Sequence, residues 1–157
     1  MLSTNNTEVR VGPAAWDELG DELRAVRTEV FIHEQGVAPE LEWDGEDAVS
    51  HHFVATTVEH PPRVVGTARL MRTGQIGRMA VLKNFRRMGI GRTLLDQAVE
   101  FALASGFARI FLHAQTHARE FYEKAGFRAA DAGEFVEANI PHVEMEFVQS
   151  PRSGSSE

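Results

Sequence analysis

The chain has 157 residues, of which 43% are hydrophobic, and its formal net charge is −7. This length suits one compact domain with a core of its own, and no apolar run is long enough to span a membrane. The acidic balance argues against broad nucleic-acid or membrane binding, and the absence of cysteine excludes disulfides, zinc–thiolate sites and a cysteine nucleophile. The polar N-terminus lacks a signal-peptide pattern, so we expect a cytoplasmic protein.

The first predicted element is an amphipathic helix from about residue 14 to about residue 33. Pro13 is tolerated at the start of a helix, and apolar residues recur behind it at three- and four-residue steps, namely Trp16, Leu19, Leu23, Val26 and Val30. The next segment, HEQGVAPELEWDGEDAVSHH, contains Gly, Pro and several carboxylates without periodicity. It predicts a long loop, and long loops in small domains are often functional.

Three strand candidates follow and predict an antiparallel meander: HHFVATTV, RVVGTARLM and IGRMAVL. A second helix is predicted from Arg87 to Ser105 and ends before Gly106. Then RIFLH predicts a strand, AREFYEKA a short helix, and VEMEFV a last strand with one buried face. The polar residues 149–157 predict a disordered tail.

The turn FRRMGIGR joins the third strand candidate to the second helix. A helix that begins there has unpaired N–H groups at its first turn, and its dipole adds partial positive charge. Gly89 and Gly91 allow a ligand to approach the backbone, while Arg86, Arg87 and Arg92 add full charges. The pattern favours a diphosphate site, with a structural turn bearing solvated arginines as an equal alternative. ATP and NAD are disfavoured because neither Gly-Lys-Ser/Thr nor a third fingerprint glycine is present.

The run from Arg86 to Gly91, RRMGIG, resembles the Q/R-x-x-G-x-G/A motif of the GNAT family of acyl-CoA-dependent N-acetyltransferases. FYEKAGF, from Phe121 to Phe127, resembles the family segment that carries a tyrosine facing the coenzyme sulfur. VFIHEQGV, ELEWDGED and EANIPHVEM are similar to the ElaA/YjcF-like branch of the family. The resemblance extends over about residues 8 to 148, and the two motifs together are more specific than either alone.

The resemblance implies an α/β (α+β) GNAT fold in which residues 1–148 form a single domain. Its mixed central sheet of about six to seven strands is antiparallel in its N-terminal part, splayed in the middle, and flanked by about four helices. Acetyl-CoA is the implied acyl donor, and no metal is expected, because no pair of histidines combines helical i, i+4 spacing with a carboxylate in the pattern of a metal site.

The resemblance also assigns coenzyme contacts. The pantetheine arm is expected to pair with the strand at Met79, Ala80 and Val81, where an N–H near Ala80 could bind the thioester carbonyl. Tyr122 is expected to give a proton to the sulfur, and Gln115 stands where many relatives have Asn. The diphosphate is expected at the turn and the first helical residues, namely Arg86, Arg87, Met88, Gly89, Ile90, Gly91, Arg92 and Thr93.

An amine acceptor must lose a proton before it attacks the thioester, so a base is needed. Glu34, beside the acidic segment, is the first candidate for that base, followed by His52 and His113; the alternative for Glu34 is an exposed helix-end carboxylate. The acidic segment either attracts a cationic amine or is a solvated charged face. The residues expected to line the acceptor site are Glu34, Glu42, Asp44, Asp47, His52, His113 and His142.

Two classes of function agree with these patterns. The first is an acetyl-CoA-dependent N-acetyltransferase that modifies a primary amine of a small molecule or peptide by direct attack in a ternary complex. The second is a catalytically silent acyl-CoA-binding regulatory module, against which the retained Tyr122 argues. The expected partner is a small-molecule amine, with neither nucleic acid nor membrane, and a homodimer is compatible with either class.

Overall fold

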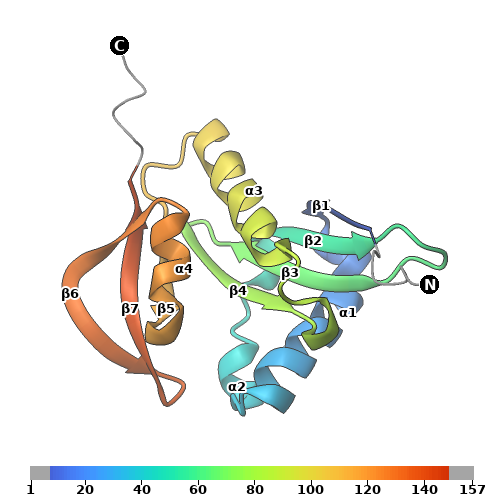
Figure 1. The fold of residues 1–157 in the computed structure, drawn as a ribbon, viewed down its shortest axis with the longest axis horizontal. Coiled ribbons are helices and arrows are strands. Elements are labelled where there is room, and N and C mark those ends of the chain that lie inside the picture. The colour runs from blue at the N-terminus through green and yellow to red at the C-terminus, as the bar shows by residue number, and fades with distance from the viewer. Residues whose placement is uncertain (1–7, 149–157) are drawn as a thin grey trace.

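The computed structural model describes residues 8–148, in which seven strands form one sheet with the order β1-β2-β3-β4-β5-β7-β6 (Figure 1). This confirms the expected mixed sheet. Two strands were not predicted from the sequence, and both lie at the edges of the sheet, β1 at one and β6 at the other. The strands are β1 (Val9–Ala14), β2 (His51–Thr57), β3 (Val64–Leu70), β4 (Gln75–Val81), β5 (Phe111–Gln115), β6 (Phe127–Glu137) and β7 (Ile140–Phe147).

Four α-helices accompany the sheet within the described residues: α1 (Trp16–Arg27), α2 (Pro39–Glu42), α3 (Ile90–Ala104) and α4 (Arg119–Lys124). The first predicted helix is present, but its last part, Thr28–Glu34, is a π-helical turn. The predicted long loop contains α2 and a short 3-10 turn, Asp47–Val49. The predicted tail, residues 149–157, lies outside the described residues, as do residues 1–7.

The sheet splits between its two parallel strands. Strands β1 to β4 are antiparallel neighbours, whereas β4 and β5 run parallel and pair at only two positions, Gln75 with Phe111 and Ile76 with Leu112. An irregularity in the β3–β4 register places Arg78 at a positive φ of 51°. Beyond it β4 diverges from β5, and Figure 1 shows the two parts of the sheet turning away from one another. The C-terminal half of β4 therefore presents an unpaired edge toward β5.

Two hydrophobic clusters fix the orientation of β4. The larger one joins α3 to the sheet through fully buried side chains such as Leu94, Leu95 and Ile76. The smaller one joins α1 and the π-helical turn to β4 through Val26, Val30 and Ala80. Burial of one such large aliphatic side chain contributes about 1.5–3 kcal/mol. Among the described residues, no helix combines the length and apolar character needed to cross a bilayer.

Candidate active site

The first part of the candidate site is the glycine turn, residues 86–91, where β4 leads into α3. Gly89 precedes the helix in the left-handed conformation, with φ 81°, and no side chain caps the helix. The first intrahelical bond runs from the Thr93 N–H to the Gly89 carbonyl at 3.1 Å, so the preceding N–H groups lack helical acceptors. A Cβ added at Gly91 would make ordinary van der Waals contact with Phe121 at 3.9 Å and Val81 at 4.0 Å, whereas one at Gly89 would meet nothing within 4 Å. The backbone here suits an anion.

The arginines of this turn have different roles. Arg86 donates from Nε to the Val81 carbonyl at 2.8 Å and from Nη1 and Nη2 to the Glu34 carboxylate at 3.0 and 2.6 Å. Its guanidinium therefore links β4 to the π-helical turn and shares its charge with Glu34, so its contact with a diphosphate stays a prediction. Arg92 donates to Asp96 at 3.0 Å, and Arg87 is exposed with φ 65°. Of the three, Arg87 is the best placed to meet an incoming anion.

The remaining residues of the turn have local structural roles. The Thr93 hydroxyl donates to the Gly89 carbonyl at 3.0 Å, Ile90 is buried in the main core, and Met88 is exposed beside β1. These contacts hold the backbone at the start of α3, so any ligand there meets N–H groups rather than these side chains.

The second part of the site is the unpaired edge of β4. The Leu82 N–H donates to the Val65 carbonyl of β3 at 2.9 Å. Because hydrogen-bonding directions alternate along a strand, the Ala80 N–H also faces β3, and the N–H groups of Met79 and Val81 face the split. An extended chain can pair with this edge as an added strand.

The third part is a cavity of about 240 Å³ at the split itself. It is bounded by the π-helical turn, β4, β5, the start of α4 and β7. The cavity thus brings together five residues singled out in the sequence, from four elements: Met79 of β4, His113 and Gln115 of β5, Tyr122 of α4 and His142 of β7. Its lining residues are Phe31, Gln35, Ile76, Gly77, Arg78, Met79, Leu112, His113, Gln115, Ala118, Tyr122 and His142.

Tyr122 enters this cavity from α4. Its ring packs edge-on against Phe121, with centroids 5.0 Å apart, and against Phe127 at 6.3 Å. Burial raises the pKa of the phenol to about 12, so the hydroxyl keeps its proton at neutral pH. On the opposite side, Gln115 at the end of β5 donates its amide N–H to Gln35 at 3.2 Å. A phenol in this state can act as a proton donor.

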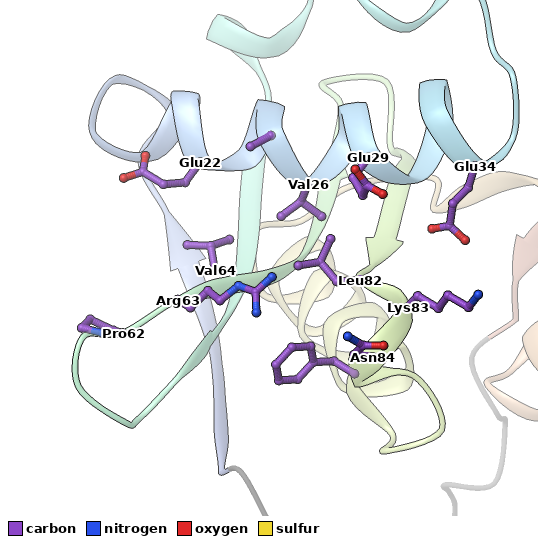
Figure 2. A pocket seen from close by; sticks show the side chains of 12 residues that line it. Glu22, Val26, Glu29, Glu34, Pro62, Arg63, Val64, Leu82, Lys83 and Asn84 are labelled. Carbon is purple, nitrogen blue, oxygen red and sulfur yellow. The ribbon is translucent and has the colours of Figure 1, made fainter.

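Glu34 does not line this cavity. The hydrogen bond from Arg86 holds the pKa of Glu34 below its ordinary value, which makes the carboxylate a weaker base. Glu34 instead borders a larger cavity of about 810 Å³ between the first helix and the β4–α3 connection. Figure 2 shows Glu22, Glu29 and Glu34 along the helix side, with Arg63 and Lys83 opposite them. These observations argue against Glu34 as the base.

The acidic segment forms a buried cluster with three arginines, which we call the arginine–carboxylate cluster. Glu42 and Asp47 are only 3% and 9% exposed. The shortest contacts join Arg27 to Glu42 and to Asp47, both at 2.7 Å. The other ion pairs, between 2.9 and 3.3 Å, are Arg69–Asp44, Arg69–Asp47, Arg78–Glu42 and Arg78–Asp44. These carboxylates are already paired with arginines, which argues against the interpretation that they attract a cationic acceptor.

The three arginines of the cluster were missed in the sequence, although a signal was present. Arg69 and Arg78 interrupt apolar strand segments, and a charged residue in such a position needs a buried partner of opposite charge. Arg78 also lines the central cavity and donates to the carbonyls of Leu41 and Glu42 at 3.2 and 3.0 Å. The acidic segment therefore fixes one wall of the cavity.

The histidines occupy different surroundings. His52 is buried, bonds through Nε2 to the Asp47 carbonyl at 2.8 Å and stacks on Trp16. Burial lowers its pKa, and it lies outside the cavity, which argues against a role in binding the acceptor. His113 and His142 both line the cavity. Among residues 8–148, no group of three or more His, Asp or Glu side chains is arranged to hold a metal ion.

A sheet split between two parallel strands, with an uncapped glycine turn at the split, defines the acyltransferase class of folds. Residues 18–149 match the family model described as an acetyltransferase (GNAT) domain, and the chain belongs to this family. It is 41% identical over 124 residues to the uncharacterized N-acetyltransferase YjcF of Bacillus subtilis strain 168, covering 76% of this chain and 86% of that protein. The resemblance inferred from the two motifs is confirmed.

Solved structures agree with this assignment. An acyl-CoA N-acyltransferase from Pseudomonas aeruginosa superposes with a TM-score of 0.77 at 28% identity, over 90% of this chain and all of that one. Escherichia coli ElaA gives the same TM-score at 23% identity over the same shares, which shows a common fold. The protein is therefore an acyltransferase.

Proposed function

We propose that the protein transfers an acetyl group from acetyl-CoA to a primary amine by direct attack in a ternary complex. The observation that carries this proposal is the continuity of three features: the uncapped start of α3, the unpaired edge of β4, and the cavity that contains Tyr122. An acyl-CoA molecule presents a diphosphate, an extended amide-containing arm and a thioester in that order. The three features match these groups in the same order.

The backbone supplies most of the proposed contacts. The diphosphate would be held by the N–H groups of Ile90, Gly91 and Arg92, with the exposed Arg87 nearby. The pantetheine amides would pair with the β4 edge at Met79 and Val81. A N–H group of that edge would also stabilise the negative charge that develops on the thioester oxygen during attack.

Tyr122 would supply the proton for the leaving group. A thiol with a pKa near 8.5 leaves tolerably well as a thiolate, so protonation helps the step without being essential. The raised pKa of Tyr122, about 12, means that the donor is fully protonated at neutral pH. Its place in the cavity beside Met79 supports this role.

A turnover assay tests this function. Thiol release from acetyl-CoA would be followed across a panel of primary amines that includes polyamines, amino acids and peptide N-termini. We expect amine-dependent release with at least one acceptor and formation of the N-acetyl product by mass spectrometry. Binding of coenzyme A without any amine-dependent release would identify the silent binding module instead.

A further inference from the structure

We infer that His142 is the general base that deprotonates the acceptor amine. The inference rests on the proposed function and deepens it by naming the group that receives the proton. His142 lies near the start of β7, opposite Gln115 of β5 and Phe135 of β6. Its ring stacks on Phe135 with centroids 5.8 Å apart, and the residue is 8% exposed. The ring is thereby held in one orientation at the wall of the central cavity.

One hydrogen bond determines the tautomer of this ring. Nδ1 of His142 lies 2.7 Å from the carbonyl oxygen of Ile140. A carbonyl only accepts hydrogen bonds, so Nδ1 must carry the hydrogen, and in the neutral ring Nε2 carries the lone pair. Within residues 8–148, the hydrogen bond of the His142 ring is made by Nδ1, and none joins Nε2 to another described residue. The lone pair is therefore available to a ligand in the cavity.

The other ionisable groups of the cavity are unsuited to this role. His113 has both ring nitrogens engaged, Nδ1 with Glu137 at 3.1 Å and Nε2 with Glu144 at 3.3 Å. Tyr122 keeps its proton because its pKa is about 12, and Arg78 is an arginine already paired with carboxylates. Among the described lining residues, Nε2 of His142 is the nitrogen that combines a lone pair with access to the cavity.

In the proposed reaction, His142 accepts one proton and Tyr122 donates one. Nε2 of His142 takes one proton from the ammonium group, and the neutral nitrogen then forms the C–N bond to the acetyl carbon. The C–S bond breaks, and the sulfur receives the Tyr122 proton. The attacking nitrogen then loses its second proton, which passes through water to the Tyr122 phenolate and restores the phenol. His142 releases its proton to solvent, so the products are the amide, the free thiol and one proton.

The variant His142→Asn tests the base directly, because the Asn amide can still donate to the Ile140 carbonyl while the Nε2 lone pair is lost. We expect kcat to fall by about 10²–10⁴-fold, with acetyl-CoA affinity unchanged by calorimetry. His51→Asn, on the exposed start of β2, is the matched control and should keep wild-type kcat. Wild-type kcat in His142→Asn would overturn the assignment.

Acceptor amines of different basicity distinguish a general base from a residue that only shapes the cavity. Ethylamine and its trifluoro analogue are amines of similar size. The trifluoro analogue is the weaker base, so it depends less on an enzyme group to remove its proton at neutral pH. The loss in His142→Asn should be at least about tenfold smaller for the weakly basic amine. Equal losses with both amines would show that His142 only shapes the cavity, and would overturn the proposal.

A spectroscopic measurement tests the proposal without turnover. Proton–nitrogen correlation NMR of the imidazole groups at alkaline pH should show His142 as the Nδ1–H tautomer. An Nε2–H tautomer would overturn the assignment even in an active enzyme. Failure of the wild-type protein to acetylate any amine would instead refute the proposed function, so the two failures are distinguishable.

Discussion

At the scale of single residues, Tyr122 shows how burial can prepare a catalytic group. The ring packs against Phe121 and Phe127 while the residue borders the cavity. This packing removes the phenol from water and raises its pKa to about 12, which disfavours the phenolate. The environment therefore keeps a proton on the side chain at every pH at which the protein would work.

Replacing Tyr122 with Phe keeps the packed ring and deletes only the hydroxyl. We expect kcat to fall by about 10- to 1,000-fold, below the general ceiling for acid catalysis, while acetyl-CoA binding and the thermal midpoint stay close to wild type. Steady-state kinetics with calorimetry and a thermal melt would measure these quantities. A wild-type kcat would exclude the hydroxyl from the mechanism.

At the scale of elements, the arginine–carboxylate cluster explains why an irregular, acidic segment holds a defined position. Arg27 of α1, Arg69 of β3 and Arg78 of β4 converge on carboxylates of the segment that runs from the end of α2 to the start of β2. Pairs buried to this extent contribute little net stability when complete, but removing one partner leaves a buried charge without compensation. The segment is thus tied to the bulged part of β4 that forms a wall of the cavity.

Glu42→Gln should therefore be strongly destabilising, because Arg27 and Arg78 both contact this carboxylate. We expect a loss of about 3–5 kcal/mol in the free energy of unfolding, measured by urea denaturation. Asp21→Asn is the matched control, since Asp21 is exposed and pairs with Arg24 within one helix, and it should cost less than about 1 kcal/mol. Similar losses in the two variants would contradict the cluster's role.

At the scale of the whole molecule, the sequence predicted the parts of the fold that have strong periodicity. The buried face of α3, with Leu94 and Leu95, and the apolar strands β2 to β4 follow directly from their patterns. The edge strands β1 and β6 were missed because VRVGPA and FRAADAGEFVE contain Gly, Pro, Ala and charged residues in place of alternating apolar ones. Edge strands need only one neighbour and tolerate such residues.

The candidate site was predictable where a short motif forms it and not where distant residues meet. The glycine turn and Tyr122 lie in contiguous motifs, and the structure places both beside the split. The partners of Glu34 and of the acidic segment were not predictable, because charge alone does not show that Arg86, Arg27 and Arg69 lie against them. The tautomer of His142 depends on a carbonyl two residues away, and no sequence pattern encodes that contact.

Because of the arginine–carboxylate cluster, the free energy of unfolding of the whole molecule depends on pH. Burial alone would raise the pKa of Asp44, but hydrogen bonds from Arg69 and the Glu46 N–H, with the charges of Arg69 and Arg78, lower it from 3.8 to about 2. The pKa of Asp47 is lowered as well, because hydrogen bonds from Arg27 and Arg69 outweigh the effect of its burial. The unfolded chain binds protons more tightly at both sites, so their contribution is full above the ordinary pKa and is lost as pH falls through the lowered pKa values, which is about 2 for Asp44.

We therefore expect the urea midpoint to fall between about pH 5 and about pH 3, and Asp44→Asn to make this decline shallower. The exposed-site variant Asp21→Asn should keep the wild-type slope, because its partner Arg24 lies at the surface. Parallel acid profiles for wild type and Asp44→Asn would show that the Asp44 pairs do not couple folding to protonation.

The central claim, that the glycine turn binds the diphosphate of an acyl-CoA, is tested most directly by titration calorimetry with coenzyme A. Gly91→Glu would place a bulky side chain and a negative charge in the first turn of α3, where the diphosphate should lie. Ala104→Glu adds the same charge at the exposed far end of the same helix and serves as the control. We predict measurable binding to wild type and to Ala104→Glu but none to a folded Gly91→Glu, whereas equal affinities in all three proteins would contradict the account.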